Sequence, residues 1–155
     1  MALVLEDGTG LSNSESYVDV AYVDAYFLKR GNTGWDSITN KESRIVLAMD
    51  FIENNYTYLG TKLVSTQSLS FPRVINGETV YPIAIKNALC ELALKANSGD
   101  LLQDTGKTTI REKVGTLEVE YDPNQDDLTS YNYVNKLLAP YLVSTSSFSY
   151  SISRV

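Results

Sequence analysis

Residues 83–96 limit the possible folds more than any other part of the sequence. Their spacing predicts a helix with apolar residues on several sides, and only three of its side chains are charged: Lys86, Glu91 and Lys95. A helix that is apolar around most of its circumference has to be covered by other elements. Pro82 suits the first turn of this helix, and Gly99 suits its end. We therefore predict that the helix lies at the centre of a helical bundle, with Cys90 buried.

A helix is also predicted to follow Asp19, whose carboxylate can accept hydrogen bonds from the free amides of a first turn. Apolar residues recur behind it at Val20, Val23 and Phe27. This spacing places them on one helical face, and Gly31 is a suitable stop. The loop that follows contains Trp35.

The next helix is predicted to begin with a capping box, in which Thr39 and Glu42 satisfy backbone amides of the first turn. Its apolar face is formed by Ile45, Met49, Ile52 and Tyr56. The helix is about four turns long and ends near Gly60. Residues 60–81 are then interpreted as a long connection, because turn-forming residues such as Pro72, Asn76 and Gly77 recur in it.

Residues 108–121 change to a two-residue period around Gly115, which predicts two short antiparallel strands. In this hairpin, Arg111 and Lys113 can face Glu118 and Glu120. A last helix is predicted from about Asp126 and Asp127, where acidic residues suit the helix dipole. Its apolar positions are Leu128, Tyr131, Val134, Leu138 and Tyr141.

The two ends of the chain differ from this pattern. Residues 1–15 are interpreted as an N-terminal arm, because residues 8–16 are small, polar and turn-prone. In residues 143–155, a C-terminal extension, Phe148, Tyr150, Ile152 and Val155 alternate with polar residues as in a strand. We expect this segment to pair with another chain, because an unpaired apolar strand promotes aggregation. The predicted fold is thus mainly α: about four helices in residues 16–142, a protruding β-hairpin and a strand-like C-terminal arm.

The composition argues against catalysis and against a metal or cofactor. The chain has no histidine and one cysteine, so the commonest general base and metal ligand is missing and an internal disulfide is impossible. Carboxylate pairs such as Glu118 with Glu120 lie where charged residues are usually solvated. We expect no enzymatic activity, no cofactor and no metal. The N-terminus has no signal-peptide pattern and no run could cross a bilayer, which favours a soluble protein made in a cytoplasm.

The charge argues against an independent nucleic-acid binder. The net charge is −6, and the thirteen basic residues are scattered along the chain, whereas phosphate contacts need clustered Lys and Arg. The eleven tyrosines fit either protein interfaces or the rim of an ordinary core.

Residues 67–73 carry an aromatic residue, Phe71, before a proline, with Arg73 close behind. An X-Pro pair favours an extended backbone. One interpretation is a structural loop held in place by Phe71. In the other, Phe71 and Arg73 form part of an interface, with Arg73 contacting a neighbouring subunit or a phosphate.

Several short segments occur in an order that resembles small phage and prophage proteins of the head-tail connector class. They are Ser16–Val18, Ala25–Phe27 with Gly31, Asn32 and Trp35, the helix from Lys41 to Tyr58, the Gln-x-Leu-x-Phe-Pro-Arg segment, Tyr81–Ile83, Ala88–Ala96 and Lys113–Asp122. Some of these proteins are labelled DnaT-like single-stranded DNA-binding proteins. The resemblance covers roughly residues 16–142, although related proteins more often have tryptophan where this chain has Phe71.

This resemblance implies a structural head-to-tail adaptor in the neck of a tailed-phage virion, made in the bacterial cytoplasm. Such proteins form a homo-oligomeric ring, commonly a dodecamer, which binds the portal protein on one side and a tail or tail-completion protein on the other. Genomic double-stranded DNA passes through the lumen without specific binding, and no membrane is involved. The interface candidates would be Phe71, Arg73, Arg111, Lys113, Glu118, Glu120, Phe148, Tyr150 and Ile152.

The alternative is a single-stranded DNA-binding or replication-loading protein. Such a protein needs aromatic side chains in a basic groove. The aromatic residues are present, but no basic groove is evident in the sequence.

Overall fold

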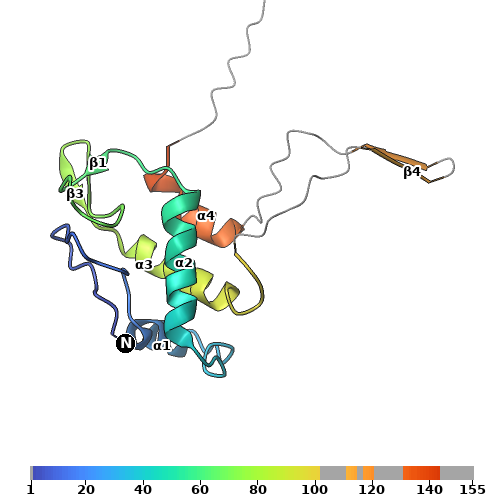
Figure 1. The fold of residues 1–155 in the computed structure, drawn as a ribbon, viewed down its shortest axis with the longest axis horizontal. Coiled ribbons are helices and arrows are strands. Elements are labelled where there is room, and N and C mark those ends of the chain that lie inside the picture. The colour runs from blue at the N-terminus through green and yellow to red at the C-terminus, as the bar shows by residue number, and fades with distance from the viewer. Residues whose placement is uncertain (1, 102–110, 115–116, 121–130, 144–155) are drawn as a thin grey trace, which may run out of the picture.

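The computed structural model describes residues 2–101, 111–114, 117–120 and 131–143. Four helices are present in these ranges: α1 (Val20–Leu28), α2 (Lys41–Asn55), α3 (Ile83–Lys95) and α4 (Asn132–Leu138), with a 3-10 turn, η1 (Ala139–Tyr141), after the last. Three short strands form one antiparallel sheet, and two more form a hairpin (Figure 1). The fold is therefore mixed α/β, and the expected helical bundle describes only part of it.

Helix α3 packs against α2, α4 and α1 (Figure 1), as its apolar sequence predicts. Its buried side chains are Ile85, Ala88, Leu89, Cys90, Leu92 and Ala93. Pro82 caps this helix directly before its first residue. Within the described ranges, no helix is long and apolar enough to span a bilayer.

The starts of α1 and α2 differ in how well the sequence predicts them. Asp19 caps α1 as expected, because its carboxylate accepts a 2.8 Å hydrogen bond from the Tyr22 amide. The capping box of Thr39 and Glu42 is wrong. The N-cap of α2 is Asn40, which has a left-handed backbone (φ 52°) and makes no capping hydrogen bond with its side chain. Because of this turn, α2 begins at Lys41, which is one residue later than a Thr39 cap would require.

The segment interpreted as a long connection contains a sheet. Strands β1 (Thr61–Lys62), β2 (Arg73–Ile75) and β3 (Glu78–Val80) pair in that order, with Val74 opposite both Thr61 and Thr79. Asn76 and Gly77, both with positive φ, form the tight turn between β2 and β3. An Asn-Gly pair is a strong hairpin signal, but the strands that it joins are too short to show an alternating pattern.

The first residues of the chain belong to the folded body and do not form the expected arm. Glu6 and Ser14 are buried. The Glu6 carboxylate accepts hydrogen bonds from the amides of Gly8, Gly10 and Leu11, each 2.9 Å long, and one from the Ser14 hydroxyl. The polar, glycine-rich residues 8–14 therefore form a loop whose amides and hydroxyl donate to the Glu6 carboxylate.

The predicted hairpin is present as β4 (Arg111–Val114) and β5 (Leu117–Glu120), and its pairing agrees with the prediction. Arg111 lies opposite Glu120, and Lys113 lies opposite Glu118. In the part of the chain that the structure describes, these two strands contact each other and no other helix or strand. The predicted start of the last helix at Asp126 and the C-terminal strand both lie outside the described residues.

Candidate nucleic-acid interface

Phe71 and Arg73, two of the predicted interface residues, stabilise the fold. Phe71 is fully buried, and its ring centroid lies 4.9 Å from that of Tyr58 and 6.3 Å from that of Tyr141. The Arg73 guanidinium donates to four backbone carbonyl oxygens, those of Tyr58, Leu59, Gly60 and Ser70. The structural-loop interpretation is thus the correct one for Phe71, and Arg73 uses its donors within the chain.

The other predicted interface residues lie either on the β4–β5 hairpin or outside the described residues. The backbone register brings Arg111, Lys113, Glu118 and Glu120 together on the β4–β5 hairpin. Phe148, Tyr150 and Ile152 lie outside the described residues. Among the described residues, Phe71 and Arg73 lie in the folded body and the other four candidates lie on the hairpin, which contacts no other described helix or strand.

A depression between α1 and the first turns of α3, here called the α1–α3 depression, is a site that the sequence analysis missed. It has a volume of about 370 Å³ and is lined by Tyr22, Ala25, Tyr26, Lys29, Arg30, Ile83 and Asn87. The residues from α1 recur every three or four positions, which places them on one face of the helix. No carboxylate is among these lining residues.

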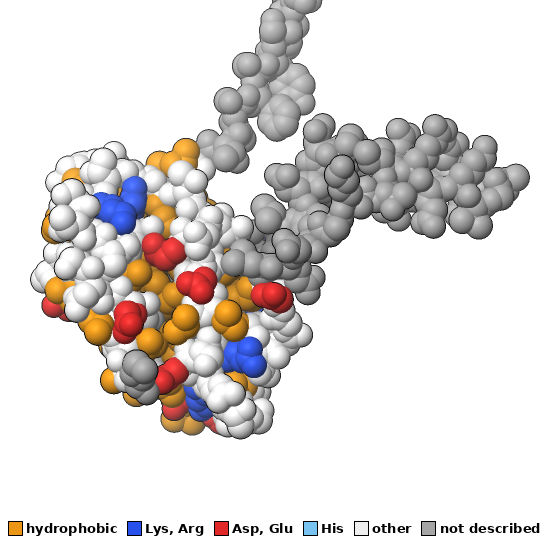
Figure 2. Space-filling model, in the orientation of Figure 1, with side chains coloured by type: hydrophobic (Ala, Val, Ile, Leu, Met, Phe, Trp, Pro, Cys, Tyr) orange, Lys and Arg blue, Asp and Glu red, His pale blue; other side chains and the backbone are white. Residues whose placement is uncertain are grey.

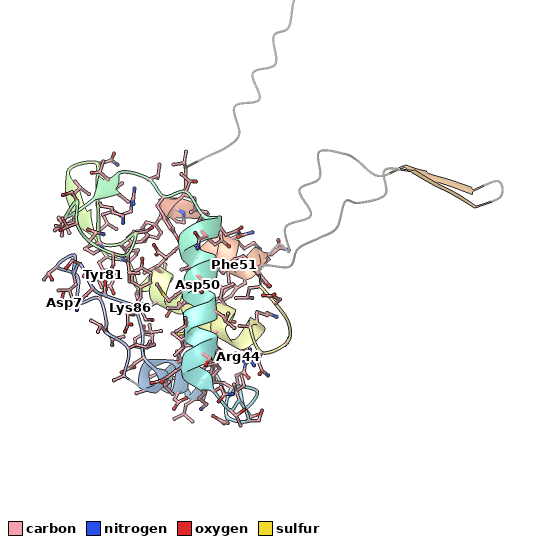
Figure 3. The ribbon with its side chains drawn as sticks, viewed as in Figure 1. Asp7, Arg44, Asp50, Phe51, Tyr81 and Lys86 are labelled. Atoms are coloured by element: carbon pink, nitrogen blue, oxygen red, sulfur yellow. The ribbon has the colours of Figure 1, made fainter. Side chains whose placement is uncertain are left out.

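Basic and aromatic side chains are in direct contact around the α1–α3 depression. The Arg30 guanidinium lies 3.4 Å from the centroid of the Tyr26 ring and donates to the Tyr26 carbonyl oxygen. Beside the depression, the Lys86 ammonium lies 5.9 Å from the centroid of Tyr22 and 4.8 Å from that of Tyr81. Figure 3 shows Lys86 and Tyr81 close together to one side of α2. Cation–π contacts hold these charged groups over rings while leaving N–H donors for a ligand.

A second, smaller depression lies between α3 and α4 and is here called the α3–α4 depression. Its volume is about 200 Å³, and its lining residues are Glu91, Lys95, Tyr131, Asn132, Tyr133 and Val134. The Tyr26 hydroxyl donates a 2.8 Å hydrogen bond to Glu91. Because Tyr26 lines the first depression and Glu91 the second, this bond joins the two. Tyr133 is 55% exposed, so its ring is available to a ligand.

The tyrosines of this surface remain protonated at neutral pH. Burial raises the pKa of Tyr26 well above its ordinary value, and the hydrogen bond to Glu91 raises it further. Burial also raises the pKa of Tyr22. Both side chains are therefore neutral, and they add no negative charge beside Lys29 and Arg30.

The face over α2 has a different character. Figure 2 shows hydrophobic side chains there, separated by several acidic groups and isolated basic ones. Val46 and Leu47 are about two-fifths exposed, and Asp50 is also exposed. Such a face suits phosphate contacts poorly, which leaves the α1–α3 depression as the better candidate.

Two groups of interest for metal binding and nucleophilic chemistry can be described: the metal-ligating side chains and Cys90. No group of three or more His, Cys, Asp or Glu side chains among them could hold a metal ion. Burial raises the pKa of the Cys90 thiol to about 12, so Cys90 stays a neutral thiol at physiological pH. A protonated, buried thiol is a poor nucleophile.

Residues 1–155, the whole chain, match the model of a family described as "Putative DnaT-like ssDNA binding protein". The chain belongs to this family. No curated protein and no solved structure matches it. Membership in the DnaT-like family does not support the resemblance to the head-tail connector class as such; it agrees with the DnaT-like label that some of those proteins carry.

Proposed function

We propose that this chain binds single-stranded DNA at the α1–α3 depression. The observation that carries the proposal is that Tyr22, Lys29 and Arg30 line one hollow surface, with the Lys86 ammonium next to it over the Tyr22 ring, in a DnaT-like family member. Proteins that bind single strands combine cations that follow the backbone with rings that stack on the bases. The α1–α3 depression supplies both.

The acidic net charge of −6 limits how strongly such a site can bind. Few cations face the ligand, so few counterions are released from the DNA. The logarithm of the affinity should fall with the logarithm of the salt concentration, with a slope of about −0.7 for each phosphate contacted on a single strand. We expect modest affinity at low salt and a shallow decrease as salt is added, because the slope is set by these few phosphate contacts.

Fluorescence anisotropy with a labelled single-stranded oligonucleotide and its duplex tests the proposal. The single strand should bind more tightly, because only unpaired bases can stack on Tyr22. Replacing Tyr22 with Ala should cost about 1–3 kcal/mol of binding free energy. Replacing Lys29 and Arg30 together with Ala should make the salt slope shallower by about 0.7 for each lost contact.

Lys136→Ala is the matched control, because Lys136 is an exposed cation on α4 that lines neither depression. Its affinity and salt slope should equal those of the natural protein. If Lys136→Ala and the Lys29/Arg30 variant lose affinity equally, the DNA binds over the general surface, and the α1–α3 depression is not the binding site. If the oligonucleotide does not bind at low salt, the proposal fails.

The head-to-tail adaptor is a second candidate function, and one observation favours it. Within the described ranges, β4 and β5 contact no other element. A two-stranded ribbon is marginal in water by itself, so a neighbouring subunit, portal or tail protein would provide the missing contacts. Both candidates give the chain a binding role without catalysis.

Negative-stain images separate the two candidates. An adaptor should form closed rings by itself or on a purified portal ring, whereas a single-strand binder should associate with DNA and not with the portal. If the protein stays monomeric and does not bind the portal ring, the adaptor function is excluded.

A further inference from the structure

The two depressions lie on one row of α3 side chains. Ile83 and Asn87 line the α1–α3 depression. Glu91 and Lys95 line the α3–α4 depression. These residues are spaced four positions apart, so they form a single ridge along one side of the helix. The two depressions therefore follow each other along α3.

Tyr26 connects the two depressions near the middle of this ridge. Its side chain lines the first depression, and its hydroxyl donates to Glu91, which lines the second. The Arg30 guanidinium lies over the same ring, 3.4 Å from its centroid. A ligand that leaves the α1–α3 depression beside Arg30 therefore reaches the α3–α4 depression by crossing Tyr26.

The α3–α4 depression repeats the chemistry of the first one. It is lined by Tyr133, whose ring is 55% exposed, and by Lys95, an exposed cation. The α1–α3 depression likewise combines Tyr22 with Lys29. Rings that stack on bases and cations that contact phosphates are the two parts that single-strand binders combine. Both depressions contain the two parts.

Glu91 is the one acidic residue among those that line the two depressions. Its carboxylate repels the phosphates of a strand that crosses this point. Arg30 lines the depression on one side of it, and Lys95 follows it by about one helical turn. A strand can therefore place phosphates at these two cations, and the carboxylate between them lowers the affinity without blocking the path.

We infer that one DNA strand occupies both depressions, with Tyr133 as a second stacking residue and Lys95 as a second phosphate contact. The inference rests on the proposed single-strand binding. From residue 83 to residue 95 the ridge is about 18 Å long. A stacked strand advances by about 3.4 Å for each nucleotide, so the ridge is long enough for several consecutive nucleotides.

Fluorescence anisotropy of the whole chain with a labelled oligo-dT of about 16 nucleotides, the upper site size of a single-strand-binding fold, tests the inference. Tyr133→Leu keeps an apolar side chain but removes the ring, and it should weaken binding at least about fivefold. Tyr133→Phe keeps the ring and should bind like the natural chain. Because Tyr133 is exposed, neither change should alter thermal unfolding.

Lys95→Ala should weaken binding and make the salt slope shallower by about 0.7. Lys136→Ala, which removes an exposed cation on α4 outside both depressions, should change neither quantity. Equal losses in these two variants would contradict the inference. So would unchanged binding by Tyr133→Leu, or equal losses in Tyr133→Leu and Tyr133→Phe.

Glu91→Gln tests whether the strand crosses from one depression to the other. The amide oxygen can still accept from the Tyr26 hydroxyl, and loss of the negative charge should raise the affinity about twofold to fivefold. Asp36→Asn removes the same charge at an exposed position outside both depressions, so it should raise the affinity less. Equal effects of the two changes would mean that the strand does not pass Glu91, and the inference would be wrong.

The Tyr22→Ala variant separates failure of the inference from failure of the proposed function. If Tyr22→Ala weakens binding and Tyr133→Leu does not, the strand is confined to the α1–α3 depression and only the inference is overturned. Failure of the oligonucleotide to bind the natural chain would overturn the proposed function and the inference with it.

Discussion

At the residue scale, Arg73 shows how a side chain predicted at an interface serves the fold. Its guanidinium has five N–H donors in a planar fork. They reach carbonyl oxygens in the segment before β1, from Tyr58 to Gly60, and in the segment before β2, at Ser70. A lysine, with one compact charge, cannot bind these four groups at once.

We therefore expect Arg73→Lys to lower the free energy of unfolding by about 1.5–3 kcal/mol, the range for hydrogen bonds to charged groups. Urea unfolding measures the change. Arg44→Lys is the control, because Arg44 donates to the Ala96 carbonyl oxygen and, among the described residues, its Nε has no hydrogen-bond partner. Equal losses in the two variants would show that the four carbonyl contacts of Arg73 add nothing specific.

The tyrosines also differ in role according to whether the side chain is buried or exposed. Tyr17, Tyr26 and Tyr58 are buried in the core, and their hydroxyls donate to Glu53, Glu91 and the Ile52 carbonyl oxygen. Much of the high tyrosine content therefore serves core packing. Tyr133 differs from them, because it lines the α3–α4 depression and its ring is exposed.

At the element scale, the three-stranded sheet depends on a close approach at Gly60, which precedes β1. Gly60 has a positive φ of 71°, and a Cβ at this position would lie 2.1 Å from the Val74 carbonyl oxygen. No substituted residue fits there unless β1 and β2 separate.

Gly60→Ala should consequently destabilise the chain more than Gly77→Ala, as measured by thermal unfolding. Gly77 also has a positive φ, 85°, but a Cβ there would meet nothing within 4 Å. Gly77→Ala should cost only the left-handed backbone strain, about 1–2 kcal/mol. The difference between the two variants isolates the steric clash, and equal effects would mean that β1 can move away at little cost.

The β4–β5 hairpin is the element whose removal should affect the fold least. Deleting residues 109–120 should leave the thermal midpoint of the remaining chain nearly unchanged, because the described strands contact only each other. Single-strand affinity should also persist, since the residues that line the α1–α3 depression come from α1 and α3 and their ends, which β4 and β5 do not contact. If the chain is a head-to-tail adaptor, the deletion variant should no longer be incorporated into phage particles. Outright unfolding of the deletion variant would place the hairpin in the core.

At the scale of the whole molecule, several ionisable groups are buried in their neutral form. Burial raises the pKa of Cys90 from 9.0 to about 12 and that of Tyr56 from 10.0 to about 12. It also raises the pKa of Tyr58 and Tyr81. These groups keep their protons in the folded chain at a pH where the unfolded chain has lost them.

The free energy of unfolding should therefore be unaffected by these groups below about pH 9 and fall as the pH rises from 9 to 12. The unfolded state binds fewer protons in this window, so rising pH favours it. Urea unfolding at a series of alkaline pH values measures the slope. Cys90→Ala should make the first part of the fall shallower, and a stability that stays constant to pH 12 would contradict the prediction.

Local patterns in the sequence were sufficient to predict the helices α1, α2 and α3 and the register of the β4–β5 hairpin. Helical spacing, the cap at Asp19 and the alternation around Gly115 all act between residues close together in the chain. The wrong capping box shows the limit of such patterns, because the left-handed turn at Asn40 displaced the start by one position.

The tertiary structure alone decided the contacts between segments that are far apart in the chain. The Glu6 carboxylate accepts hydrogen bonds from the amides of a segment that the sequence predicts as an arm. The Arg73 guanidinium donates to backbone carbonyl oxygens within the chain. Helices α1 and α3 pack so that Tyr26 donates to Glu91, 65 positions away in the sequence. Helical spacing identifies the face on which Tyr22 and Lys29 lie, but it does not say which helix faces them. That choice depends on how the apolar faces of separate helices fit together, because close packing in the core selects one arrangement among several with the same local pattern.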